Sequence, residues 1–340
     1  MRGFWDKLEK PIIGLSPMDG VTDAACRYIT AKYGKPSFMM TEFTNVEGLA
    51  RGAVKMMVAF LYDEIERPIV GQIYGVEVNS FYKCSVMLCA MGFDGIDINM
   101  GCPANNVAKR GSGAGLIQTP ELAREIIRSC KKGAADFYNG ITLEEAGVHP
   151  AIIEEIPVIA ERRLVPVSVK TRIGYGEIVT ESWISNLLEE KPANITLHGR
   201  TLKQMYMGKA NWEEIEKAAR ICKEHGVSLL GNGDVESRED ALKKIEEYGV
   251  DGVLIGRATF GNPWIFKGVE PTMEERMAVA LEHARVFDRI GRVHFQYIKK
   301  HLGWYCKGFD GAKEMRKELM LGENLEDIEE VFKKFFYERS

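Results

Sequence analysis

Short runs of apolar residues alternate with helical patterns along most of the chain. The runs are rich in Val, Ile and Leu and are bounded by turn or capping residues, as is typical of parallel strands buried on both faces. Between most of them, apolar residues recur at three- and four-residue spacing, which indicates helices. The eight predicted strands are residues 11–15, 37–41, 68–73, 95–98, 165–170, 193–197, 227–230 and 250–255.

This alternation predicts an α/β fold, a (β/α)8 TIM barrel. A doubly wound open sheet is the alternative, but the first predicted strand lacks the Gly-x-Gly-x-x-Gly turn typical of that fold. The strand pattern stops after Trp264, and residues 272–336 have the pattern of helices, with breaks near 308–311 and at Gly322. We therefore expect two domains: a barrel over residues 1–268 and a helical domain over residues 269–340.

One connection inside the predicted barrel is unusually long. Residues 133–163 separate the fourth helix from the fifth strand, whereas about 2–6 residues are usual for such a connection. Residues 150–160 within it have the pattern of an extra helix. We interpret the segment as an insertion, and the sequence gives no indication of its role.

The composition is that of an ordinary globular protein, since 45% of the 340 residues are hydrophobic and 28% are charged. No apolar run approaches the roughly 18 residues that span a bilayer, and the first residues lack the apolar core of a signal peptide. We expect a cytoplasmic protein without membrane contact. The seven cysteines form no Cys-x-x-Cys pair and show no zinc-ligand spacing, so we expect neither a disulfide framework nor a metal site.

The net charge of −4 gives no global sign of a nucleic-acid partner. Within the predicted helical domain, however, residues 276–317 hold ten Lys and Arg against four Asp and Glu, an excess of +6. Residues 323–330 reverse the sign with five acidic side chains. A solvated helical surface and a local RNA-binding surface are both consistent with this split.

Polar residues follow nearly every predicted strand, at the end where barrels carry their functional groups. Gly233 and Gly256 lie in the loops after the last two strands, where barrels commonly bind phosphate through backbone N–H groups. Lys170 ends a buried strand, where an unpaired charge is costly unless an anionic ligand meets it. His198 ends the next strand. Together these groups favour flavin mononucleotide (FMN), with Lys170 beside the edge of the flavin ring that becomes negative on reduction.

Cys102 is the candidate for proton chemistry. It follows Asn99 at the end of the fourth predicted strand and precedes a glycine-rich loop. It is the only group of residues 97–103 that can release a proton near neutral pH, because a thiol has a pKa of about 8.5.

The chain resembles the tRNA-dihydrouridine synthases. The matching motifs cover nearly its whole length and occur in the same order as in that family. The matching motifs are SPMDGVTD (16–23), DINMGCP (97–103), KRGSG (109–113), VKTRIG (169–174), TLHGRT (196–201), GNGD (231–234), IGR (255–257), KHLGWY (300–305) and GA (311–312). The resemblance implies an FMN-binding barrel, a helical tRNA-binding domain and reduction of a uridine in tRNA. It departs from the usual pattern at Asp19, at Gly71 and in the long 133–163 segment.

Carried over by position, the resemblance assigns three kinds of site residue. Cys102 resembles the catalytic acid, and Asn99, Lys109 and Arg172 are plausible substrate contacts. The residues that resemble flavin contacts are Pro17, Met18, Asp19, Gln72, Lys170, His198, Asn232, Gly233, Asp234, Gly256 and Arg257.

The predicted chemistry suits these residues. Hydride from reduced FMN adds to C6 of uracil, and the resulting enolate needs a proton at C5, which a neutral thiol at Cys102 can donate. NADPH is the expected reductant, tRNA the expected partner, and a monomer the expected state. Arg110 and Arg200, with Lys109, are expected to present positive charge to RNA at the barrel mouth. Two alternatives stay open: a flavin-dependent reductase of a free pyrimidine or small enone, and a non-catalytic tRNA-binding protein.

Overall fold

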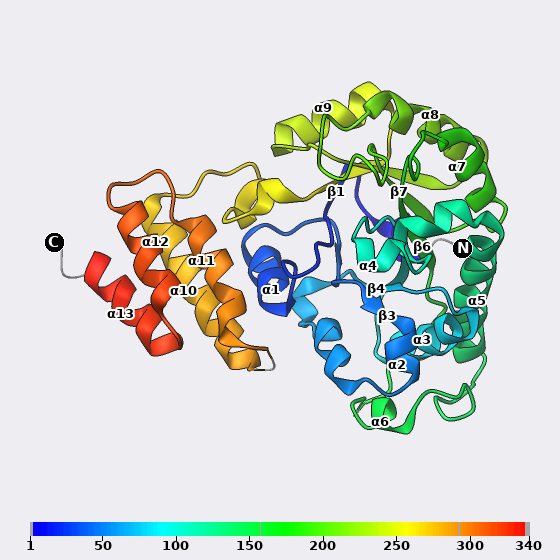
Figure 1. Cartoon of the computed structure of the whole chain (residues 1–340), viewed down its shortest axis with the longest axis horizontal. Coiled ribbons are helices and arrows are strands. Elements are labelled where there is room, and N and C mark those ends of the chain that lie inside the picture. Colours follow the sequence, from blue (N-terminus) through cyan, green and yellow to red (C-terminus); the bar gives the residue numbers. More distant parts are fainter. Residues whose placement is uncertain (1–2, 157, 292, 337–340) are drawn as a thin grey trace.

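The computed structural model describes residues 3–156, 158–291 and 293–336. Within them, nine strands form one sheet in which every neighbouring pair is parallel, in the order β1-β9-β8-β7-β6-β5-β4-β2, with β3 also beside β4 (Figure 1). The strands are β1 (Ile12–Leu15), β2 (Met39–Met40), β3 (Thr44–Asn45), β4 (Ile69–Tyr74), β5 (Gly95–Met100), β6 (Val167–Arg172), β7 (Asn194–His198), β8 (Ser228–Asn232) and β9 (Gly252–Ile255).

Backbone hydrogen bonds close the sheet into a barrel. Ser37 N–H donates to the Ile13 carbonyl at 2.8 Å, and Leu15 N–H donates to the Phe38 carbonyl at 3.3 Å, which joins β1 to the segment that leads into β2. The predicted (β/α)8 barrel is therefore confirmed, and each of the eight predicted strands overlaps an observed one. The short strand β3 was not predicted, because two residues, one of them Asn, carry no strand pattern.

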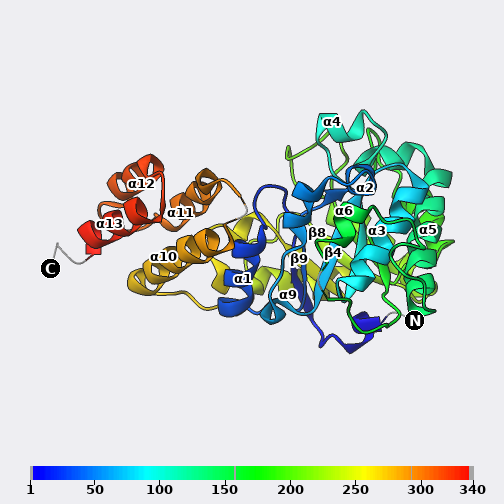
Figure 2. The same ribbon diagram turned by 90° about the horizontal axis from the view of Figure 1, so that it is seen from below.

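The N-terminal segment closes the end of the barrel at which the strands begin. The 3-10 helix η1 (Gly3–Lys7) places the Trp5 ring 4.7 Å from Phe38, inside a cluster with apolar side chains of β1, β2, β4, β8 and β9. A Cβ added to Gly95, the first residue of β5, would lie 2.9 Å from the Phe4 ring. Figure 2 shows this segment below the strands and α4 above them. The other end of the barrel, where the strands finish, holds the polar residues.

Helices surround the strands and bury apolar side chains against them (Figure 1). They are α1 (Ala24–Tyr33), α2 (Val46–Ala50), α3 (Val78–Ala90), α4 (Asn105–Ala108), α5 (Pro120–Tyr138), α6 (Pro150–Ile153), α7 (Thr180–Leu188), α8 (Trp212–Glu224) and α9 (Arg238–Tyr248), with the 3-10 helices η2 (Val54–Phe60), η3 (Glu64–Glu66), η4 (Gly113–Gln118), η5 (Arg257–Thr259) and η6 (Pro263–Phe266).

The structure corrects two predictions about the 133–163 segment. The fourth helix of the barrel does not stop at Gly133, because α5 continues to Tyr138. Gly133 instead permits close packing: an added Cβ would lie 2.7 Å from the Tyr82 carbonyl oxygen of α3. The extra helix predicted over 150–160 is only the four-residue α6, and residue 157 lies outside the described residues.

The C-terminal helices form a second hydrophobic cluster beside the barrel. They are α10 (Met273–Ile290), η7 (Phe295–Ile298), α11 (Lys299–Tyr305), α12 (Ala312–Leu321) and α13 (Leu325–Phe336). Ala25 and Ile29 of α1 and Trp264 belong to the same cluster, so these helices pack on the barrel through α1 (Figures 1 and 2). Thr272 and Glu275 form a reciprocal capping box that starts α10.

The close contact at Gly133 gives a test of this packing. In an ordinary helix, Gly→Ala stabilises by about 1 kcal/mol. Gly133→Ala should instead lower the free energy of unfolding by about 1–3 kcal/mol, because the Cβ would meet the backbone of α3. Urea denaturation measures this, with Glu125→Ala on the exposed face of α5 as the control that should change stability by less than about 0.5 kcal/mol. A stabilised Gly133→Ala variant would contradict the packing.

Candidate active site

The predicted site residues share one edge of the barrel. Gln72 lies in β4, Asn99 in β5, Lys170 and Arg172 in β6, His198 ends β7, and Asn232 ends β8. Pro17, Met18 and Asp19 follow β1, and Gly256 and Arg257 follow β9. Because all the strands are parallel, these positions meet where the strands finish.

A buried polar network crosses the barrel below this edge. The Asp97 carboxylate accepts hydrogen bonds from Gln72 Nε2 at 2.8 Å and from Ser168 Oγ at 2.7 Å. Gln72 Oε1 in turn accepts from Asn99 Nδ2 at 3.1 Å. Asp97, Gln72 and Ser168 are fully buried. Burial raises the pKa of Asp97 to about 6, although the two hydrogen bonds and the charge of Lys170 act to lower it.

The network ends at the loop that carries the thiol. Asn99 Oδ1 accepts from the backbone N–H of Gly101 at 3.0 Å and from that of Cys102 at 2.9 Å. On its other side, the loop contacts Gly113 (φ +57°), where an added Cβ would lie 3.0 Å from the Cys102 carbonyl oxygen. Asn99, predicted to contact substrate, therefore also fixes the backbone before Cys102.

Cys102 itself is buried, with 8% of its surface exposed. Burial raises the pKa of its thiol, and the negative charge of Asp19 acts in the same direction, while the backbone N–H of Ala104 and the charges of Arg172 and Lys170 act to lower it. The thiol is consequently protonated at neutral pH. Such a group can donate a proton but is a poor nucleophile.

Lys170 is held beside Asn232. Its Nζ donates to Asn232 Oδ1 at 3.1 Å, while Asn232 Nδ2 donates to the Leu254 carbonyl at 3.0 Å and so fixes the amide. Burial lowers the pKa of Lys170 to about 8, and Arg172 acts in the same direction against Asp97. An ammonium group with one neutral partner suits an anionic ligand, which would restore its charge.

The loops after β8 and β9 have the features expected of a phosphate site. Gly233 has φ +122° and Asp234 has φ +50°, both in the left-handed region. Within the described residues, no hydrogen bond is donated by the backbone N–H groups of Gly233 and Asp234, nor by those of Gly256 and Arg257. Unpaired N–H groups in glycine-rich loops at this end of a barrel fit the phosphate of FMN.

Asp234 organises the arginines around these loops. Its carboxylate accepts from Arg257 Nη2 at 2.9 Å, from Arg200 Nη2 at 2.6 Å and from the Ala210 N–H at 2.8 Å. Burial alone would raise the pKa of Asp234, but these three partners hold it below its ordinary value. Of the two arginines paired with Asp234, Arg257 is the exposed one, and its guanidinium lies over the Tyr206 ring at 5.7 Å.

His198 is neutral in this environment. Burial holds its pKa well below 6.5, and the nearby charges of Arg172, Lys170 and Arg200 act in the same direction. Its Nε2 lies 3.3 Å from Arg200 Nη1 and can accept a hydrogen bond from it in one tautomer. His198 thus packs beside Gly233, where an added Cβ would lie 3.0 Å from its ring.

Two arginines at the mouth, Arg200 and Arg172, are buried. Arg200 is 2% exposed and donates to the Met207 and Gly208 carbonyls as well as to Asp234, so its predicted role as a surface charge for RNA is wrong. Arg172 is 4% exposed and donates to the Gly101 carbonyl at 2.6 Å. Contact between Arg172 and substrate stays a prediction. The sequence could not place either residue, because Arg200 bonds to the Asp234 carboxylate and Arg172 to the Gly101 carbonyl, both distant in the chain.

The remaining predicted residues are placed but not tested. Asp19 and Lys109 are exposed at the mouth. Met18 belongs to a turn held by Thr22, whose hydroxyl accepts from the Met18 N–H at 3.0 Å.

All seven cysteines are free thiols, and the described residues contain no cluster of three or more potential metal ligands. No helix of the described residues is long and apolar enough to cross a membrane.

The fold and this edge place the chain among the (β/α)8 barrel enzymes whose active sites lie at the carboxyl ends of the strands. Comparison with known proteins narrows the class. The model of the family described as Dihydrouridine synthase (Dus) matches residues 14–136 and 148–339, so the chain belongs to that family and is an enzyme. The internal unmatched residues, 137–147, comprise the end of α5 and part of the long segment that follows it.

Individual relatives agree with the family match. The chain is 34% identical over 342 residues to a "Probable tRNA-dihydrouridine synthase" of Staphylococcus aureus strain COL, covering 98% of this chain and 95% of that protein. It is 32% identical to a "Probable tRNA-dihydrouridine synthase 2" of Bacillus subtilis strain 168, covering 98% and 96%. Among solved structures, one of DHODH from Eimeria tenella with ferulenol matches with a TM-score of 0.49 at 14% identity, covering 82% of this chain and 84% of that one.

The buried network predicts a stability cost at Gln72. Gln72→Leu removes one partner each from Asp97 and Asn99 and should lower the free energy of unfolding by about 1–3 kcal/mol. Chemical denaturation at pH 7 measures the loss. Gln118→Leu, at an exposed position, is the matched control and should change stability by less than about 0.5 kcal/mol. Equal stabilities of the two variants would show that the network does not contribute.

Proposed function

We propose that the protein is a tRNA-dihydrouridine synthase, which reduces the C5=C6 bond of a uridine in tRNA with FMN and NADPH. The observation that carries the proposal is a buried, protonated thiol at the same barrel edge as a half-buried lysine and two glycine-containing loops with unpaired N–H groups. The family match and the relatives' names support it.

FMN would be held through both of its ends. The N–H groups of Gly233, Asp234, Gly256 and Arg257 would bind its phosphate, and Lys170 would lie beside the ring edge. Pro17 and Met18 are proposed to border the ring. Gln72, which bonds to Asp97 and Asn99 in the structure, would support the ring from the strand below. When bound and reduced by NADPH, FMN supplies a hydride to C6 of uracil.

The side chains of this chain would do the rest of the chemistry. The Cys102 thiol donates its proton to C5 of the enolate that forms on uracil, which requires a thiol that is neutral before the reaction. Asn99 holds the Cys102 backbone and so keeps the sulfur in one position. Contacts of Asn99, Lys109 and Arg172 with the uridine would orient the base.

The target base must leave its stack to reach the barrel mouth, which costs a few kcal/mol at most for an unpaired nucleotide. Recognition of folded RNA depends mainly on backbone charge and shape. The excess of Lys and Arg in residues 276–317 supports the C-terminal helices as the tRNA-binding part, with the barrel as the catalytic part. We expect the enzyme to act as a cytoplasmic monomer.

The thiol is tested by substitution. Cys102→Ala should retain FMN and tRNA binding but reduce tRNA about 10²–10⁴-fold more slowly, since positioned acids contribute on this order. Cys130→Ala, a buried cysteine of α5, is the control and should retain activity. Dihydrouridine formation is measured on tRNA from a strain that lacks the modification. Unchanged activity of Cys102→Ala, or equal turnover of free uridine, would count against the mechanism or the substrate.

The raised pKa of Cys102 predicts a pH profile. Alkylation of the thiol by iodoacetamide should be slow at pH 7 and should accelerate only above the ordinary thiol pKa of about 8.5. The acid step should correspondingly weaken as the pH rises through the raised pKa, where the proton to be donated is lost. Mass spectrometry of the Cys102 peptide follows the alkylation. Rapid alkylation below pH 7 would indicate a thiolate and overturn the assigned role.

Lys170 is tested through the cofactor. Lys170→Met removes the charge and keeps a side chain of similar length. The fold should therefore be as stable as wild type or more stable, while the bound FMN per chain should fall at least about tenfold. Lys170→Arg retains the charge and serves as the comparison. Absorbance of the purified proteins near about 450 nm, where oxidised flavins absorb, measures FMN. A colourless wild-type protein that cannot be reconstituted would refute the cofactor.

A further inference from the structure

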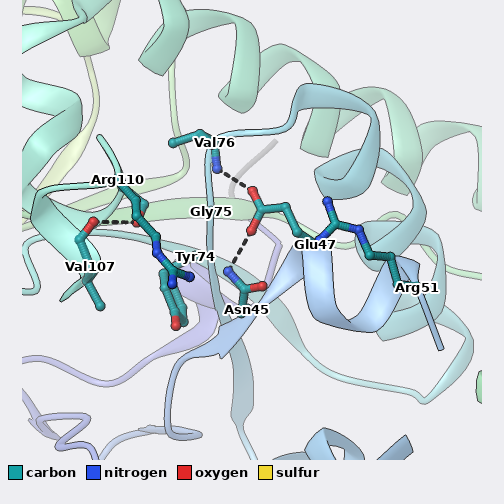
Figure 3. A pocket seen from close by; sticks show the side chains of 9 residues that line it. Asn45, Glu47, Arg51, Tyr74, Gly75, Val76, Val107 and Arg110 are labelled. Atoms are coloured by element: carbon teal, nitrogen blue, oxygen red, sulfur yellow. Dashed lines mark hydrogen bonds between the residues drawn. The ribbon is translucent and has the colours of Figure 1, made fainter. Parts of the chain in front are cut away.

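A cavity lies beside the loop that carries Cys102 (the thiol loop), outside the residues assigned to FMN and uridine. It has a volume of about 250 Å³ and lies between the start of α2, the end of β4 and the loop at 107–112 (Figure 3). This volume is below the roughly 300–1,000 Å³ of sites that enclose a whole drug-sized ligand. The cavity therefore suits one small group of a larger molecule.

One wall of the cavity belongs to the loop that supports Cys102. Val107 and Ser112 line the cavity, and Ser112 Oγ donates to the Val107 carbonyl at 2.9 Å. A Cβ added to Gly113 would lie 2.9 Å from Val107 Cγ1 and 3.1 Å from Cys102 Cβ. A group bound in the cavity is thus separated from the thiol by one turn of chain.

Two arginines reach the cavity without a protein partner. Within the described residues, the guanidinium groups of Arg51 and Arg110 form no ion pair and donate no hydrogen bond. Figure 3 shows them on opposite sides of the cavity, with the Arg110 side chain extending toward Tyr74. Unpaired guanidinium groups in a small cavity are suited to phosphate, which they bind with paired N–H donors.

The one carboxylate in the cavity is already satisfied. Glu47 accepts from the Val76 N–H at 2.6 Å, the Glu77 N–H at 2.9 Å and Asn45 Nδ2 at 2.5 Å. Both of its oxygens are therefore directed to the wall, and two positive charges face one negative charge. Burial raises the pKa of Tyr74, whose neutral ring forms a further wall of the cavity.

We propose that this cavity binds the phosphate and ribose of the nucleotide next to the target uridine. The inference rests on the proposed function, because a uridine inserted at Cys102 brings its neighbouring phosphate along the same strand. Arg110 is the principal phosphate contact, since it lies on the thiol loop next to Lys109, and Arg51 binds from the other side. Lys109, the neighbour of Arg110, is a proposed uridine contact, which favours RNA over NADPH as the source of the phosphate.

The test is the salt dependence of tRNA binding by the full chain. Arg110→Ala should raise the Kd about 3- to 10-fold and reduce the slope of log Kd against log salt by about 1, as for one lost phosphate contact. Arg51→Ala should act in the same direction, and Arg110→Lys should keep the slope. Arg220→Ala, an exposed arginine on the outer face of α8, is the matched control and should change neither. Unchanged slopes in both alanine variants would overturn the proposal.

A second measurement separates the alternatives. The rate at which NADPH alone reduces the enzyme's flavin should be the same in Arg110→Ala and in wild type. A slower rate with unchanged tRNA binding would assign the cavity to the reductant and overturn the RNA assignment. A wild-type protein that binds tRNA but forms no dihydrouridine would refute the proposed function instead, so the two failures are distinguishable.

Discussion

The chain of hydrogen bonds from Asp97 through Gln72 to Asn99 is the constraint on which the site depends. It links the neighbouring strands β4 and β5 and ends on the backbone of the Cys102 loop. A thiol that donates a proton must stay neutral and must not move, and both conditions follow from burial combined with a fixed loop. The same buried carboxylate faces Lys170 and acts to raise its pKa. One network therefore fixes the loop of the proposed acid and influences the pKa of Lys170.

Much of the barrel follows from local sequence patterns. Parallel strands buried on both faces read as apolar runs, and their polar ends coincide with the site because every strand points the same way. Cys102, Lys170 and the two glycine-rich loops could be selected for this reason. The family match and the relatives agree with the family that the sequence motifs indicate, and the roles of the individual site residues stay predictions.

The parts that the sequence did not reveal depend on partners distant in the chain. Arginine is usually a surface residue, but Arg200 is buried. Its guanidinium donates to the distant Asp234 carboxylate as well as to the nearby Met207 and Gly208 carbonyls. Glycine is typical of a helix end, but Gly133 lies within α5, where α3 is so close that a larger residue would contact its backbone. In both cases the residue type is explained by a contact that no local pattern encodes.

The packing of aromatic side chains at the start of the barrel has a consequence for how ligands reach the site. Trp5, Phe4 and Phe38 pack together at the end of the barrel where the strands begin, so the described residues leave the polar site facing the rim where the strands finish. Under the proposed function, a reductant and a polynucleotide that both need the same prosthetic group would therefore approach from that one side.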